Sequence, residues 1–152
     1  MATAPLWSRK SLDVFLKEKN RVQDEQLEGI QLVRAAEGGG WAGHLVDAGC
    51  VTENELLQLV LVETGLPYIP LLQVTIAQDL FAQFTAEFLR TFECMPIDRI
   101  EPVLTLATPN PFQQELLRSR DSRYQEVRLF VCRVSEWREC LRRQTAKAQA
   151  KA

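Results

Sequence analysis

Residues 41–70 read WAGHLVDAGC VTENELLQLV LVETGLPYIP, and this stretch predicts two helices followed by a break. The second helix has the clearer start, because Thr52 followed by Glu55 is a capping box in which each side chain reaches the other residue's backbone. Gly65 is a residue type that often ends a helix, and Pro67 prevents the helix from continuing. We therefore expect a helix from about residue 52 to residue 64, and an extended chain after it. This helix is apolar almost all round, so we expect it to be buried on most sides.

A weaker copy of this pattern lies 29 positions earlier in the chain. The matched pairs are Leu16 with Leu45, Val22 with Val51, Gln23 with Thr52, and Leu27 with Leu56. The repeat predicts a helical subdomain over residues 11–66, with about four short helices and Ser11 as the first N-cap. Residues 1–10 are expected to form a flexible tail.

The second half of the chain alternates β-like runs with helical patterns. Residues 76–92 predict one or two short helices, residues 111–120 predict another, and Ser135 is expected to cap the last. The expected strands cover residues 94–97, 103–108 and 127–134. The order β-β-α-β-α gives a small α/β subdomain over residues 67–143, and hence an α+β fold class, with residues 144–152 as a tail or linker.

The composition indicates a globular domain without a bound metal. The chain has 152 residues, of which 46% are hydrophobic and 25% charged, and no stretch long and apolar enough to span a membrane. It shows no signal peptide at its N-terminus, so we expect a cytoplasmic protein without direct membrane insertion. Four scattered cysteines and one histidine offer no metal-ligand set, and no cofactor is expected.

Charge is concentrated at the C-terminal end. From Arg133 onward there are six Lys or Arg residues and two Glu residues, a net charge of about +4. A basic helix end is stabilised by the helix dipole, and it can also bind an acidic partner surface. Nucleic acid is not expected, because no aromatic side chains alternate with the basic ones.

Motifs for catalysis are missing from the sequence. It contains no G-x-x-x-x-G-K-[ST], G-x-S-x-G, H-E-x-x-H or G-x-G-x-x-G, so we expect no enzyme. The run Gly38–Gly40 is a hinge or, alternatively, a phosphate cradle formed by backbone N–H groups. His44 has no recognisable acidic partner, which favours a packing or partner-facing role over a general base.

Four short segments, taken in order, resemble the N-terminal domain of type II secretion and type IV pilus assembly ATPases. These segments are Leu45 to Thr52, Thr64 to Tyr68, Met95 to Ile97, and Leu104 to Pro111. One version of that domain, found in pilus extension motors, binds cyclic di-GMP. The resemblance covers about residues 12–143.

The resemblance implies two tandem ligand motifs of the form R-L-G-x-x-L, each followed by two leucines and a glutamine. The second motif falls on Gly40, Ala42, Leu45, Leu56, Val60 and Glu63, and the first on Ser11, Leu12, Asp13, Leu16, Leu27, Gln31 and Arg34. Gly40 stands in place of the arginine and Glu63 in place of the glutamine. Because arginine both pairs with phosphate and stacks on bases, these positions are expected to be non-functional and cyclic di-GMP binding lost.

The resemblance then implies a non-catalytic docking or adaptor domain. Its partner would be a protein of a secretion or pilus machine, such as the inner-membrane platform protein or a motor, which would recruit it to the inner face of the cell membrane. The candidate contact residues are Trp41, Arg138, Arg142 and Arg143. The alternative is a cyclic di-GMP sensor with a variant motif, for which Arg9, Lys10 and Arg34 are the nearby cations.

Overall fold

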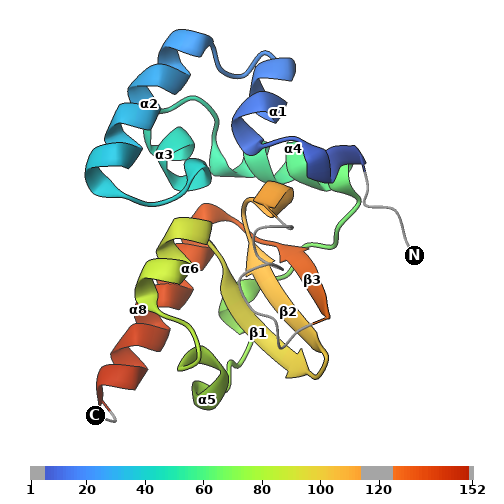
Figure 1. Ribbon diagram of the computed structural model, residues 1–152, viewed down its shortest axis with the longest axis vertical. Coiled ribbons are helices and arrows are strands. Elements are labelled where there is room, and N and C mark those ends of the chain that lie inside the picture. The colour runs from blue at the N-terminus through green and yellow to red at the C-terminus, as the bar shows by residue number, and fades with distance from the viewer. Residues whose placement is uncertain (1–5, 114–124, 151–152) are drawn as a thin grey trace.

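A computed structural model describes residues 6–113 and 125–150 of the chain. It confirms the expected α+β class: a group of short helices packs above a three-stranded sheet, with further helices against that sheet (Figure 1). We call these two parts the helical unit and the α/β unit.

The helical unit contains a 3-10 helix, η1, and four α-helices. Their bounds are η1 Leu6–Arg9, α1 Leu12–Glu18, α2 Asp24–Glu37, α3 Trp41–Asp47 and α4 Glu53–Thr64. The predicted cap at Thr52 is confirmed, since its side chain accepts the Glu55 N–H at 3.1 Å. Gly65 ends α4 in a left-handed conformation (φ 68°), which glycine adopts without the steric cost that other residues carry.

Two expectations for the helical unit need correction. Residues 6–9 were expected in a flexible tail, yet they form η1, and Trp7 is buried with its ring 5.8 Å from that of Phe112 in an edge-on arrangement. Helix α4 was expected to be buried on most sides, but Val62 is 85% exposed. Helix α4 has more apolar residues than fit on the face that packs against the core, so the remaining ones, such as Val62, are exposed to solvent.

The α/β unit follows the predicted order as far as the described residues allow. Its elements are η2 Leu71–Gln73, α5 Gln78–Phe81, α6 Ala86–Phe92, β1 Met95–Ile100, β2 Val103–Thr108, η3 Pro111–Gln113, β3 Glu126–Val131 and α8 Val134–Ala150. Strand β2 lies between an antiparallel β1 and a parallel β3. Most of the helix expected at residues 111–120 lies outside the described residues.

The last helix differs from its prediction at both ends. It begins at Val134, and its first turn is capped by Glu136, whose carboxylate accepts the Arg133 N–H at 2.9 Å, not by Ser135. The helix continues to Ala150 through residues expected to form a tail. Gln144 is buried there and accepts a hydrogen bond from Gln78 of α5, so this stretch packs against the α/β unit.

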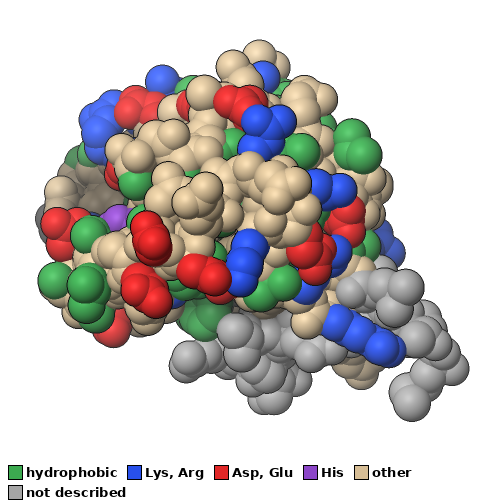
Figure 2. All heavy atoms as spheres, turned by 90° about the horizontal axis from the view of Figure 1, so that it is seen from above, with side chains coloured by type: hydrophobic (Ala, Val, Ile, Leu, Met, Phe, Trp, Pro, Cys, Tyr) green, Lys and Arg blue, Asp and Glu red, His purple; other side chains and the backbone are tan. Residues whose placement is uncertain are grey.

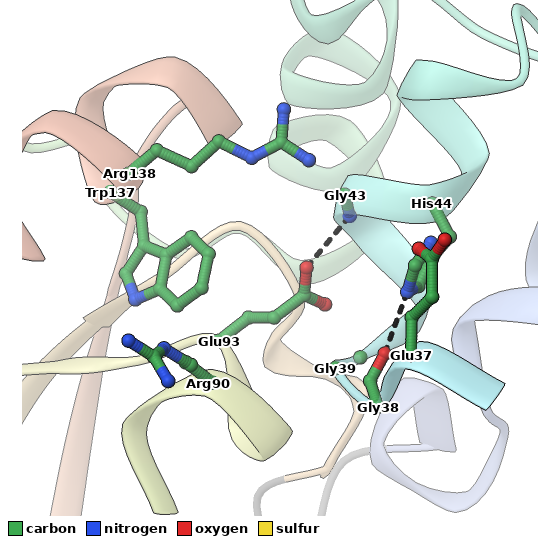
Figure 3. Close-up of a pocket in the computed structure, with 10 residues that line it drawn as sticks. Glu37, Gly38, Gly39, Gly43, His44, Arg90, Glu93, Trp137 and Arg138 are labelled. Atoms are coloured by element: carbon green, nitrogen blue, oxygen red, sulfur yellow. Dashed lines mark hydrogen bonds between the residues drawn. The ribbon is translucent and has the colours of Figure 1, made fainter. Parts of the chain in front are cut away.

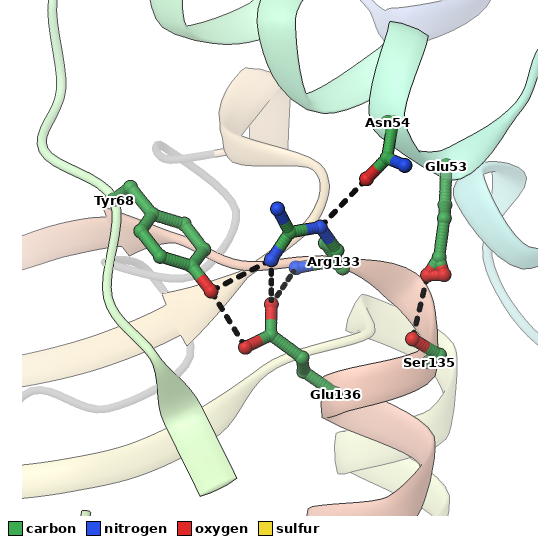
Figure 4. Close-up of polar contacts among 6 residues, drawn as sticks. All are labelled: Glu53, Asn54, Tyr68, Arg133, Ser135 and Glu136. Atoms are coloured by element: carbon green, nitrogen blue, oxygen red, sulfur yellow. Dashed lines mark hydrogen bonds and ion pairs between the residues drawn. The ribbon is translucent and has the colours of Figure 1, made fainter. Parts of the chain in front are cut away.

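The two units are joined by the Gly-Leu-Pro-Tyr break and by a polar network (Figure 4). The Tyr68 hydroxyl donates to Glu136 Oε2 at 2.8 Å and accepts from Arg133 Nη1 at 2.8 Å. Arg133 also reaches Asn54 of α4, at 2.7 Å. The apolar core of the helical unit includes Phe112 and two other residues from the second half of the chain, Val131 and Val134. The helical unit is therefore completed by the C-terminal half of the sequence.

Candidate functional site

The N-terminus of α3 is occupied by a carboxylate from the other unit. Glu93, which follows α6, accepts the Ala42 N–H at 2.8 Å and the Gly43 N–H at 2.7 Å, one on each oxygen. These N–H groups lack partners within the helix, and the helix dipole favours an anion beside them. In Figure 3 the Glu93 side chain extends from the α/β unit and points at Gly43.

The backbone of Glu93 is held in an unusual conformation. Its φ of 48° is left-handed, which costs a residue other than glycine about 1–2 kcal/mol. The Thr108 hydroxyl donates to the Glu93 carbonyl at 2.8 Å, and the residue is 2% exposed. Burial raises the pKa of the Glu93 carboxyl, and the hydrogen bonds from Gly43 and Ala42 act in the opposite direction.

Two glycines allow this close approach between the units. A Cβ atom at Gly40 would overlap the Glu93 carboxylate, and one at Gly43 would lie 2.7 Å from Arg138 Nη2. Gly40 has an ordinary extended backbone (φ −96°), so its requirement is for space and not for a special conformation. Gly40, the last residue of the run Gly38–Gly40, therefore lies against an anion supplied by the chain itself.

A pocket of about 190 Å³ lies beside this contact. His44 forms part of its wall, with Nε2 2.7 Å from the Gly38 carbonyl oxygen. Arg138 also lines it and binds Asp47 with both terminal nitrogens, at 2.9 and 2.8 Å. His44 and Arg138 therefore help to hold α3 in place through these contacts. Neither contact is that of a nucleophile with a general base.

The expected ligand-motif positions are mostly packing residues. Ala42, Leu45, Leu56 and Val60 are each at most 2% exposed in the core of the helical unit. Glu63, at the position of the motif's glutamine, instead pairs with Lys10 at 3.1 Å.

The expected contact residues lie on two separate surfaces. Trp41 lies in a groove of about 630 Å³ along α2. The Arg34 guanidinium covers the Trp41 ring, with its central carbon 4.4 Å from the ring centroid. Arg138 and Arg142 line a groove of about 500 Å³ along α8. Arg143 does not line it, but shares Glu139 with Arg142 as an ion-pair partner. We call these surfaces the α2 groove and the α8 groove.

Sequence reasoning missed two residues of this region. Arg90 of α6 lines both the 190 Å³ pocket and the α8 groove, and it makes no hydrogen bond or ion pair with another described residue. Glu93 is the second. Neither follows from a local pattern, because each depends on the packing of α6 against α8 and α3.

A family model for the MshEN domain matches residues 64–150, more than half of the chain. The chain belongs to this family. The MshEN domain is the N-terminal domain of type II secretion and type IV pilus ATPases. The matched range begins at the end of α4, after both degenerate ligand motifs.

Solved structures show the same fold over nearly the whole chain. A structure described as MshE with cdg is 22% identical, with a TM-score of 0.54, and covers 90% of this chain and 99% of its own. The N-terminal domain of XpsE is 20% identical, with a TM-score of 0.57, covering 94% and 99% respectively. No curated protein sequence matches. At these identities the likeness establishes the fold alone.

Two further properties concern only the described residues. None of their helices is long and apolar enough to cross a membrane. Nor do they bring together three or more His, Cys, Asp or Glu side chains in a way that would hold a metal ion.

Proposed function

We propose that this MshEN domain is a non-catalytic docking domain of a secretion or pilus machine that has lost the binding of cyclic di-GMP. The observation that carries the proposal is the Glu93 carboxylate on the N–H groups of Ala42 and Gly43. Donors that would attract a phosphate are already satisfied by an internal anion. The site has become an internal contact between the two units.

Charge and space around α3 both support the loss of the ligand. At the N-terminus of α3 an anionic dinucleotide meets the Glu93 carboxylate, while the surrounding pocket is also lined by Glu37, by Arg90 and by the Asp47-bound Arg138. An arginine at position 40 is excluded as long as Glu93 occupies the helix N-terminus, because even a Cβ overlaps its carboxylate. A missing charge-assisted contact typically costs about 1.5–3 kcal/mol, and here repulsion is added to that loss.

The docking surface that we propose is the α8 groove. Arg90, Arg138 and Arg142 surround Leu141, and no carboxylate is among the described residues that line the groove. Arginines around an apolar centre are typical of protein interfaces. The complementary partner surface is acidic with an apolar centre.

The first test is a calorimetric titration of cyclic di-GMP, with GTP as the control ligand. We expect no saturable heat at high ligand concentration, because the anion position is filled. Binding at micromolar or lower concentration would refute the loss of the ligand and would support the alternative, a sensor with a variant motif.

The second test measures binding of the purified cytoplasmic domain of the inner-membrane platform protein from the same organism. Combining Arg90→Gln with Arg142→Gln should weaken binding about tenfold, equivalent to about 1.4 kcal/mol. The single variants Arg90→Gln and Arg142→Gln are each compared with Arg128→Gln, since Arg128 is an exposed arginine on β3 outside the groove. Equal weakening by Arg128→Gln would show a general charge effect and contradict this docking surface.

A further inference from the structure

The α2 groove has the opposite charge to the α8 groove and an apolar floor. We propose that it is a second docking surface, and that its occupant is a basic amphipathic segment of a partner protein. This inference rests on the docking role proposed above and adds a partner chemistry that the α8 groove cannot accept. A domain with both surfaces can bridge two partners of opposite charge.

The apolar part of the groove comes from α2 and the start of α3. Leu27 and Trp41 are half-buried and pack against the core of the helical unit, while Leu32 is 73% exposed beside them. A leucine this exposed, next to an indole in a concave surface, offers apolar area that a partner can cover. Figure 2 views the helical unit from above, where acidic, basic and hydrophobic side chains all reach the surface.

The acidic part of the groove is supplied by Asp13, Asp24 and Glu28. Arg34 lies over the Trp41 ring and donates to Gln31 at 2.8 Å, so its positive charge offsets part of this negative charge and leaves the groove acidic. Lys17 already holds Asp24 at 2.7 Å. Asp13 and Glu28 make no hydrogen bond or ion pair with another described residue, so both remain available to incoming cations.

Only one class of occupant satisfies both parts of the groove. Nucleotides and anionic lipid surfaces carry phosphates, which the three carboxylates repel. A wholly polar cationic segment would leave Leu32 uncovered. A helix with an apolar stripe flanked by Lys or Arg covers Leu27 and Leu32, and places its cations against Asp13 and Glu28.

The three tryptophans of the chain report on three different places. Trp41 lines the α2 groove, Trp137 lines the α8 groove, and Trp7 is buried in the helical unit. In nitrogen-15 spectra their indole N–H signals therefore separate the two surfaces, with Trp7 as an internal control. The probes are the platform protein's cytoplasmic domain, a helical leucine–lysine peptide of about four turns, and the same peptide with glutamate for lysine.

We expect the leucine–lysine peptide to shift the Trp41 signal and to leave Trp7 and Trp137 in place. Combining Glu28→Gln with Leu32→Ala should weaken this binding at least about tenfold. The matched control combines Glu25→Gln with Val62→Ala, an equal charge change and another exposed aliphatic residue, both outside the groove. The control should bind within about twofold of the unchanged chain.

Several results would overturn the inference, and they differ from failure of the docking role. An unmoved Trp41, a groove variant that binds as well as the unchanged chain, or equal binding of the leucine–glutamate peptide would refute it. So would a Trp41 shift that grows with protein concentration alone, because the occupant is then a second copy. A platform domain that moves only Trp137, together with a leucine–lysine peptide that leaves Trp41 in place, would keep the docking role and refute the second surface. A peptide that moves Trp41, with no binding of the platform domain, would keep the groove's chemistry and refute the docking role for that partner.

Discussion

Replacing Glu93 by alanine tests whether its carboxylate holds the two units together. The change leaves the N–H groups of Ala42 and Gly43 without their acceptor, at a position that is 2% exposed. Each buried donor left without an acceptor costs about 1–3 kcal/mol. Removing the buried charge of Glu93 is favourable and offsets part of the combined cost of the two donors. We expect Glu93→Ala to lower the free energy of unfolding by about 2–4 kcal/mol. Glu93→Gln keeps one acceptor oxygen and should cost about half as much.

The assay is urea unfolding, monitored by tryptophan fluorescence and repeated between pH 8 and pH 4.5. Burial raises the pKa of Glu93 in the folded state, so the folded protein holds this proton more tightly than the unfolded chain. The ordinary pKa of a glutamate carboxyl is about 4.5. The stabilising contribution of the bound proton is therefore fully present below about pH 4.5, and it is lost as the pH rises through the folded-state pKa. The difference between the unchanged chain and Glu93→Gln should accordingly grow as the pH falls.

The control for this experiment is Glu87→Gln, which removes an exposed carboxylate from the first turn of α6. Its cost should stay below about 1 kcal/mol, the size of a surface charge–dipole effect. The reasoning is refuted if Glu93→Ala costs no more than this control. It is also refuted if the difference between the unchanged chain and Glu93→Gln is independent of pH, or shrinks as the pH falls.

Three further predictions use the same unfolding assay or mass spectrometry. Tyr68→Phe removes the hydroxyl that donates to the buried Glu136 and should cost about 1–3 kcal/mol; a loss below 0.5 kcal/mol, on the order of a surface change, would contradict its joining role. Asp47→Asn should cost at most about 1 kcal/mol at pH 7, because the pair with Arg138 is half-exposed. The Arg138 hydrogen bonds lower the pKa of Asp47, so this cost should be fully present above about pH 3.8 and be lost as the pH falls from there through the lower folded-state pKa; a cost that grows as the pH falls would argue against the ion pair. Iodoacetamide should label half-buried Cys50 first and the three buried cysteines only on unfolding, which peptide mass spectrometry resolves.

Features that depend on neighbouring residues could be predicted from the sequence. The Thr52 cap, the Gly65 helix end and the extended chain after Pro67 all follow from backbone chemistry within a few residues. The strands were also found, because runs such as Val103–Thr108 favour extended structure. Local chemistry also explains why the α+β class was predictable.

Features that depend on contacts between distant segments could not be predicted in this way. The burial of Trp7 requires Phe112, which lies more than a hundred positions away. The length of α8 was underestimated because its last turns look like a polar tail, whereas Gln144 packs against α5. The relative positions of the expected contact residues could not be predicted either, since no pattern in the sequence shows that Trp41 and Arg142 lie in different grooves.

The structure adds to what the sequence predicts about Gly40. In the sequence it is an arginine position without its arginine, which predicts weaker binding and nothing more. In the structure, the space that a side chain would need is filled by Glu93, and the donors next to it are already bonded. Restoring a side chain at position 40 would therefore displace Glu93 from α3 and open the contact between the units. A side chain at position 40 therefore requires a compensating change at Glu93.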